Sequence, residues 1–110
     1  MGVMDEREWF REEFAGTDPD RLWTALRRVL STMDLKQADD GTRVALFSTG
    51  TTSTSWGQHL RAEVTGGAGG AVLTVRGRPR ASFLSSGWGE DLHMRGVRGQ
   101  LVGDVRSALA

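Results

Sequence analysis

The chain has 110 residues, of which 38% are hydrophobic and 25% charged, a balance typical of one soluble globular domain over residues 1–110. It has no cysteine, which excludes disulfides and cysteine-based metal sites, and no apolar leader or run near the ~20 residues of a membrane span, so we expect a cytoplasmic protein. Its net charge is zero, but residues 1–20 hold seven acids and two arginines and residues 41–88 hold five arginines and one acid. This asymmetry either steers an anionic partner to one face or makes the two regions attract each other, and we expect the second.

The first segment, residues 6–14, fits two structures. A helix and a strand both place Phe10 and Phe14 on one face, because a spacing of four residues suits either period. The acids and arginines of the segment favour a helix, whereas a short strand before the next helix suits the rest of the chain. Both structures stay open at this point.

A helix is predicted to follow Thr17-Asp18-Pro19-Asp20, which supplies a capping residue, a proline for the first turn and an acid beside it. Apolar residues then repeat at helical spacing and make one buried stripe, with Trp23 beside it. The stripe consists of Leu22, Leu26, Val29, Leu30 and Met33. We expect the helix to end near Met33 to Asp34.

Four strands are predicted next, over residues 35–38, 42–49, 58–65 and 71–78. Asp39-Asp40-Gly41 is a tight-turn signal between the first two, and the glycine-rich residues 66–70 predict a flexible connection between the last two. In the last two strands alternate residues are apolar and should face a core. These residues are Leu60, Ala62, Val64, Ala71, Leu73 and Val75.

A last helix is predicted over residues 90–109. Its apolar stripe consists of Met94, Val97, Leu101, Val105 and Ala108, extended by Val102 and Leu109. Gly96, Gly99 and Gly103 lie on one line opposite that stripe. Each glycine costs a helix about 1 kcal/mol relative to alanine. Either these glycines are tolerated on an exposed face, or a second copy packs closely there in a homodimer.

These elements predict an α+β fold. An antiparallel meander of four or five strands should form one layer, and the N-terminal helix and the long C-terminal helix should pack on one of its faces.

Two stretches of similar sequence contain a Trp-Gly pair. We call Ser53–Leu60 the first cassette and Ser85–Leu92 the second cassette; both have small hydroxylated residues before the pair and end in leucine. The sequence suggests two matching corners in loops, at Trp56-Gly57 and Trp88-Gly89. Their indoles either close the ends of the core or form a contact surface, for which tryptophan and arginine are favoured.

Arginines recur on the predicted sheet. Arg76, Arg78 and Arg80 stand at a spacing of two, so they point the same way if their strand continues. Arg61 and Arg43 on neighbouring strands would extend this face, with Phe47 among them. Such a face suits single-stranded nucleic acid. The alternative is a solvated face, or one paired with the acidic start of the chain.

No catalytic residue, metal ligand or cofactor is assigned. His59 and His93 are too few for a three-histidine zinc site, and no nucleotide-binding glycine pattern is present. Ser85, Ser86, Asp91 and His93 lie close in sequence, but the glycine-flanked serine of a nucleophile elbow is missing.

Residues 14–26, Phe-Ala-Gly-Thr-Asp-Pro-Asp-Arg-Leu-Trp-Thr-Ala-Leu, resemble the opening of helix-grip proteins of the Bet v 1 or START-like type. The order of meander and long C-terminal helix is similar too. The resemblance implies a curved antiparallel sheet that grips a helix around an apolar cavity, and it implies a small apolar ligand.

The sequence thus suggests a non-catalytic binding or interaction protein that associates as a homodimer. The expected contact residues are Trp56, Gly57, Trp88, Gly89, Arg61, Arg76, Arg78 and Arg80. A helix-grip protein with an apolar ligand and a single-strand nucleic-acid binder are the alternatives, the second being the weaker. No membrane partner is expected.

Overall fold

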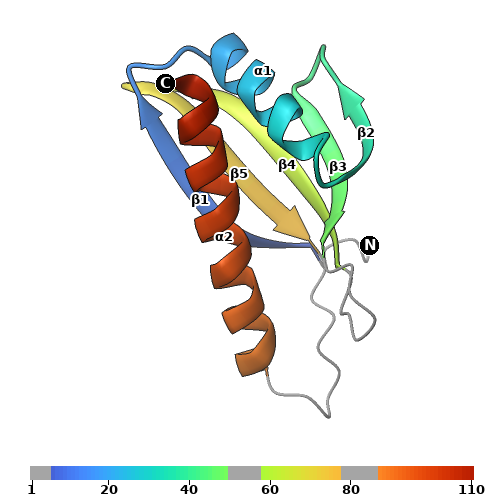
Figure 1. Cartoon of the computed structure of the whole chain (residues 1–110). Coiled ribbons are helices and arrows are strands. Elements are labelled where there is room, and N and C mark those ends of the chain that lie inside the picture. Colours follow the sequence, from blue (N-terminus) through green and yellow to red (C-terminus); the bar gives the residue numbers. More distant parts are fainter. Residues whose placement is uncertain (1–5, 50–57, 78–86) are drawn as a thin grey trace.

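The computed structural model describes residues 6–49, 58–77 and 87–110, with the backbone alone described for residues 58 and 87–93. Its strands form one antiparallel sheet in the order β1-β5-β4-β3-β2, and both helices cover the same face of this sheet (Figure 1). The predicted α+β architecture is confirmed, with five strands. The elements are β1 (Arg7–Ala15), α1 (Pro19–Leu30), β2 (Asp34–Asp39), β3 (Val44–Thr49), β4 (Gln58–Gly67), β5 (Gly70–Gly77) and α2 (Gly87–Leu109).

The ambiguous first segment is a strand. β1 pairs with β5, the last strand of the chain, and Phe10 and Phe14 are buried in the core. The register shifts between Glu8 and Phe10, so Trp9 is the extra residue of a bulge. Burial of the two phenylalanines against a sheet outweighs the weak helical preference of the intervening charges.

The start of α1 follows the predicted capping pattern. The carboxylate of Asp18 accepts hydrogen bonds from the backbone N–H groups of Asp20, at 2.7 Å, and Arg21, at 3.3 Å. Pro19 occupies the first turn, where a missing N–H costs least. The predicted stripe is buried at Leu22, Leu26, Val29 and Leu30 and only partly at Met33.

The end of α1 differs from the prediction, because the helix stops at Leu30 rather than near Met33. The Ser31 and Thr32 hydroxyls donate to backbone carbonyls three residues back, each at 2.7 Å. The backbone N–H of Met33 also bonds three residues back, to Leu30. These bonds tighten the chain into a turn that leads directly into β2.

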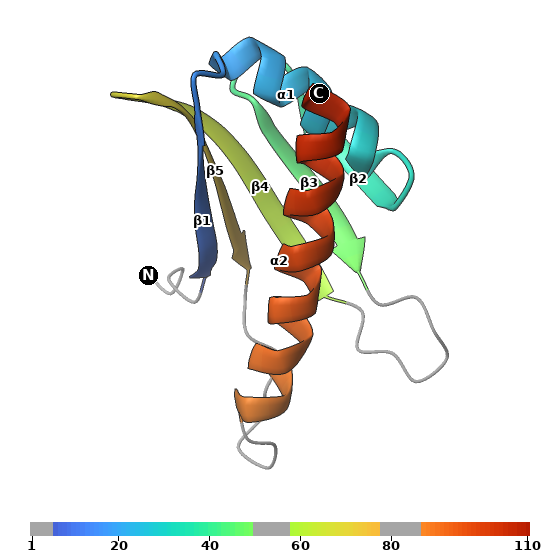
Figure 2. The same ribbon diagram turned by 60° about the vertical axis from the view of Figure 1, so that its left-hand side comes forward.

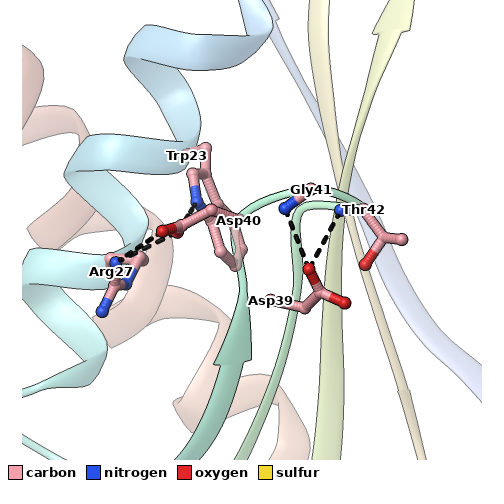
Figure 3. A network of polar contacts seen from close by, with 6 residues as sticks. All are labelled: Trp23, Arg27, Asp39, Asp40, Gly41 and Thr42. Carbon is pink, nitrogen blue, oxygen red and sulfur yellow. Dashed lines mark hydrogen bonds and ion pairs between the residues drawn. The ribbon is translucent and has the colours of Figure 1, made fainter.

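The turn between β2 and β3 is longer than the predicted tight turn. The carboxylate of Asp39 accepts from the backbone N–H groups of Gly41 and Thr42 (Figure 3). The backbone N–H of Arg43 donates to the Asp39 carbonyl. Arg43 has a φ of 56°, a left-handed conformation that ends the turn.

A second network ties this turn to α1. The indole N–H of the buried Trp23 donates to Oδ1 of Asp40 at 2.8 Å, and Arg27 donates to both oxygens of the same carboxylate (Figure 3). Trp23 therefore buries its ring in the core while its polar edge meets an acid at the surface.

The glycine-rich segment between β4 and β5 is not the flexible connection that we expected. Gly66 and Gly67 belong to β4 and Gly70 begins β5, so only Ala68 and Gly69 form the turn. Gly70 has a φ of 154°, and a Cβ there would lie 2.4 Å from the Phe14 carbonyl oxygen. A glycine is required because the backbone at the end of β1, which pairs with β5, lies too close for a side chain at this residue.

α2 begins at Gly87, three residues earlier than predicted, so Trp88 and Gly89 lie in a helix and the second cassette is not a loop corner. The sequence carries N-terminal signals that favour this start, since serines precede Gly87 and acids follow at Glu90 and Asp91. In both views its N-terminal end projects beyond the strands, and β4 bends along its length (Figures 1 and 2).

The faces of α2 follow the predicted pattern. Met94, Leu101 and Val105 are buried, and the rest of the predicted stripe is partly buried. Gly96, Gly99 and Gly103 are exposed, and a Cβ added at any of them would meet no atom within 4 Å.

Glu12 of β1 holds the flank of α2. Arg98 donates to one oxygen of its carboxylate at 2.7 Å and Arg106 to the other at 2.8 Å. The hydrogen bond from Arg98 lowers the pKa of Glu12 below its ordinary value; burial opposes this shift, and the bond and charge of Arg106 support it. The same guanidinium groups lie over the rings of Phe10 and Phe14, at 5.7 and 4.6 Å.

Within the described part of the chain, neither helix is long and apolar enough to cross a membrane.

Candidate functional site

The face of the sheet turned away from the helices, here called the outer face, carries two arginines side by side. Arg61 of β4 and Arg76 of β5 are directly opposite each other, and their side chains are 35% and 34% exposed. The Nε atom of each is buried without a hydrogen-bond partner. Like charges directly opposite in a sheet repel, so this arrangement needs anions nearby.

Acids at the start of the chain supply part of that charge. Arg61 donates to the carboxylate of Glu6 at 2.5 Å. Arg76 lies 3.6 Å from Glu63 and 3.9 Å from Glu8, and both separations exceed a hydrogen bond. The expected attraction between the acidic start and the arginine-rich middle is confirmed.

A hollow of about 630 Å³ lies beside this arginine pair. We call it the outer-face hollow; its described lining is Glu6, Lys36, Leu46, Phe47, His59, Leu60, Arg61 and Gly77. Phe47 and Leu60 turn their side chains into the core, so they contribute backbone. Leu46 turns outward and is 40% exposed, which makes the hollow both charged and apolar.

One pair of side chains beside the hollow invites comparison with a catalytic dyad. Oγ of Ser48 and Nδ1 of His59 share a hydrogen bond of 3.0 Å. Ser48 is buried, and β3 is paired on both sides with β2 and β4, so its amides are committed to the sheet. The hydrogen bond holds the imidazole of His59 against Ser48.

The predicted contact residues fall into three groups. Arg61 and Arg76 come together on the outer face. The backbone of Trp88 and Gly89 lies in the first turn of α2. The remaining four lie outside the described residues: Trp56, Gly57, Arg78 and Arg80.

The strand ends that flank the connections containing these cassettes lie at one end of the sheet, where β3 and β5 finish and β4 begins. β3 ends at Thr49, which is opposite Gln58 at the start of β4. Leu60, two residues further, is opposite Gly77 at the end of β5. The outer-face hollow is lined by residues at this same end.

Two residues of the predicted basic face lie elsewhere. Arg43 is in the turn between β2 and β3 and donates to Asp20 at the start of α1, at 2.6 Å. Phe47 is buried in the core together with Ala45, because residues two apart in a strand point to the same face. Among the described residues, the exposed large apolar side chain of the outer face is Leu46.

Sequence reasoning missed Glu6, Lys36 and Leu46 as lining residues and placed His59 outward without a role. Leu46 had a readable signal, since it is a large apolar residue at an outward position between two inward ones. Glu6 had none, because its place beside Arg61 depends on the pairing of β1 with β5.

No group of three or more histidines, aspartates and glutamates in the described ranges could hold a metal ion. No protein-family model matches the chain, and a search of curated proteins finds no match.

Proposed function

We propose that this chain is a non-catalytic cytoplasmic binding protein whose contact surface is the outer-face hollow and the adjoining end of the sheet. The hollow is the observation that carries the proposal. Its volume falls within the range of ligand sites, and it combines an exposed leucine with Lys36, His59 and Arg61. The cytoplasmic location rests on the absence of cysteine from the sequence.

The two cassettes support the same location for the contact surface. Thr49 and Gln58, the described strand ends on either side of the first cassette, lie at the end of the sheet that carries the hollow. The end of β5, which precedes the second cassette, lies there too. We assign Trp56 and Trp88 to this surface, because tryptophan beside arginine is a favoured combination in contact sites.

Self-association through α2 is part of the proposal. Gly96, Gly99 and Gly103 leave open space along one exposed side of the helix. A second α2 could approach its backbone closely there, which would offset the helical cost of three glycines.

A second candidate is a helix-grip protein that holds a small apolar ligand between the sheet and α2. One observation bears on it: Nε1 of Trp9 is buried without a hydrogen-bond partner and lies close to Gly77. A mainly apolar ligand with one acceptor atom would satisfy this donor. The bend of β4 is also what a gripping sheet requires (Figure 2). Single-stranded nucleic acid is a weaker third candidate, since acids lie beside both described arginines of the outer face.

Lys36 provides a direct test, because it is the only lysine in the chain and it lines the hollow. We would acylate the protein with an amine-reactive ester, in buffer and in extract of the native cells, and follow Lys36 by mass spectrometry. An occupied hollow should slow its acylation by a factor that rises with extract concentration. The extract would also be divided by ultrafiltration. Protection of Lys36 by the filtrate would indicate a small ligand, and protection by the retentate would indicate a macromolecular partner.

The matched control is Arg28→Lys, which places a second lysine on the exposed side of α1. Its acylation should be equally fast in buffer and in extract. Equal rates at Lys36 in both media would refute the proposed contact surface.

A further inference from the structure

We infer that the outer-face hollow binds a carboxylate carrying an apolar chain, and that Glu6 occupies the carboxylate position until such a ligand displaces it. The inference rests on the proposed function and names the class of ligand. It follows from three features of the described residues: unused arginine donors, a removable acid and an adjoining apolar surface.

The first feature is the excess of donors over acceptors. A guanidinium has five N–H groups, and Arg61 uses one of them on Glu6, while its Nε stays buried and unpaired. Arg76 beside it keeps acids only at 3.6 and 3.9 Å, and its Nε is also unpaired. Arg61 lines the hollow and Arg76 does not. A carboxylate with two oxygens would therefore bind the terminal N–H groups of Arg61, with the charge of Arg76 beside them.

The second feature is the position of the acid that now contacts Arg61. Glu6 precedes the first residue of β1 and is therefore outside the sheet ladder. Its side chain is 40% exposed. Exposed ion pairs contribute little, about 0.2–1 kcal/mol, so a competing carboxylate can replace Glu6 at small cost. Because Glu6 is itself a carboxylate, Arg61 already presents the geometry that this group needs.

The third feature is the apolar wall. Leu46 is 40% exposed in the same hollow, on the neighbouring strand and directly opposite Arg61. A carboxylate on Arg61 would therefore leave its substituent beside Leu46, where burial of methylene groups adds affinity. Lys36 and His59 complete the rim, and the ammonium group of Lys36 is paired with Asp34 at 3.2 Å.

The test is a titration of the full chain with butyrate, hexanoate and octanoate, followed by NMR through the side-chain Nε–H of Arg61. We expect saturable shifts, with an affinity that rises at least about tenfold from butyrate to octanoate. Hexanol and hexylamine, which keep the chain and lack the carboxylate, should cause no shift. Inorganic phosphate that bound as tightly as octanoate would overturn the inference, because no apolar contact would then be needed.

Variants assign the roles. Glu6→Gln removes the competing carboxylate and should raise the affinity for octanoate about two- to fivefold. Arg61→Gln should lower it by more than about tenfold. Arg95→Gln is the control, since Arg95 is an exposed arginine of α2, which covers the other face of the sheet, and it should leave the affinity unchanged.

An unchanged affinity in Glu6→Gln and Arg61→Gln would overturn the inference. Its failure can be told apart from failure of the proposed function. Protection of Lys36 in cell extract without any binding of carboxylates would leave the contact surface standing and reject only this ligand class.

Discussion

At the scale of single residues, Glu12 is the point where α2 is fastened to the edge of the sheet. It accepts from Arg98 and Arg106, and its side chain is only 22% exposed. We predict that Glu12→Gln lowers the free energy of unfolding near neutral pH, because both ion pairs lose their negative charge. The loss should be only about 1 kcal/mol, since the partner arginines are half exposed and solvent screens part of the interaction. Glu13→Gln, at an exposed neighbour, should have almost no effect.

The Glu12 contribution also depends on pH in a definite direction. The folded-state pKa of Glu12 is lowered below 4.5, so its stabilisation is complete above that value and is lost as the pH falls through the folded pKa. The free energies of unfolding of wild type and Glu12→Gln, measured with urea, should therefore converge as the pH falls through the folded pKa of Glu12. A gap that widened on acidification would contradict the assigned contacts.

Asp40 offers a second test at this scale. Asp40→Ala leaves the indole N–H of Trp23 without an acceptor, which should cost about 1–2 kcal/mol. Asp40→Asn keeps an acceptor and loses only an exposed ion pair with Arg27, so it should cost less than about 0.5 kcal/mol. Chemical unfolding followed by circular dichroism measures both variants. Equal losses would show that the indole bond is not what holds the turn on α1.

At the scale of elements, the hairpin between β4 and β5 depends on Gly70. Gly70→Ala should lower the free energy of unfolding by at least about 2 kcal/mol, because a Cβ would strike the backbone of β1 and the φ of 154° is strained for alanine. Gly69→Ala, in the same turn but with open space around it, should stay within about 0.5 kcal/mol of wild type. Similar melting temperatures for the two variants would disprove the close approach of the β1 backbone to Gly70.

Periodicity predicted most of these elements, because each strand of the meander has apolar residues at the alternate positions that face the core. Leu60, Ala62 and Val64 alternate clearly, and β4 was predicted to start at its observed first residue. The end of α1 was missed because it depends on the hydroxyls of Ser31 and Thr32, which bond equally well inside and after a helix. β1 stayed ambiguous because a spacing of four cannot separate a helix from a strand.

The candidate site was less predictable than the fold. Spacing alone placed Arg61 and Arg76 outward, but the register that sets them opposite each other is a property of the whole sheet. Their carboxylate partners come from two separate segments, Glu6 and Glu8 at the start of the chain and Glu63 in β4. The outer-face hollow has no linear signature, because its lining comes from β2, β3, β4, the end of β5 and Glu6 before β1.

At the scale of the whole molecule, the open glycine side of α2 allows the proposed dimer to be tested. Gly99→Leu should convert the proposed dimer into a monomer, since the leucine would hold two helices apart. The monomer itself should stay folded, because a Cβ at Gly99 meets no atom within 4 Å. Sedimentation velocity measures the change. Asp104→Leu, on another exposed side of the same helix, should remain dimeric.

The central claim, a self-associating binding protein with its contact surface at the outer-face hollow, is tested most directly by native mass spectrometry of untagged protein freshly purified from its own cells. Mass and stoichiometry are then read together. The wild type should appear as a dimer that carries a bound molecule, and Leu46→Asp should lose that molecule while keeping the dimer. A bare wild-type monomer would contradict both parts of the claim.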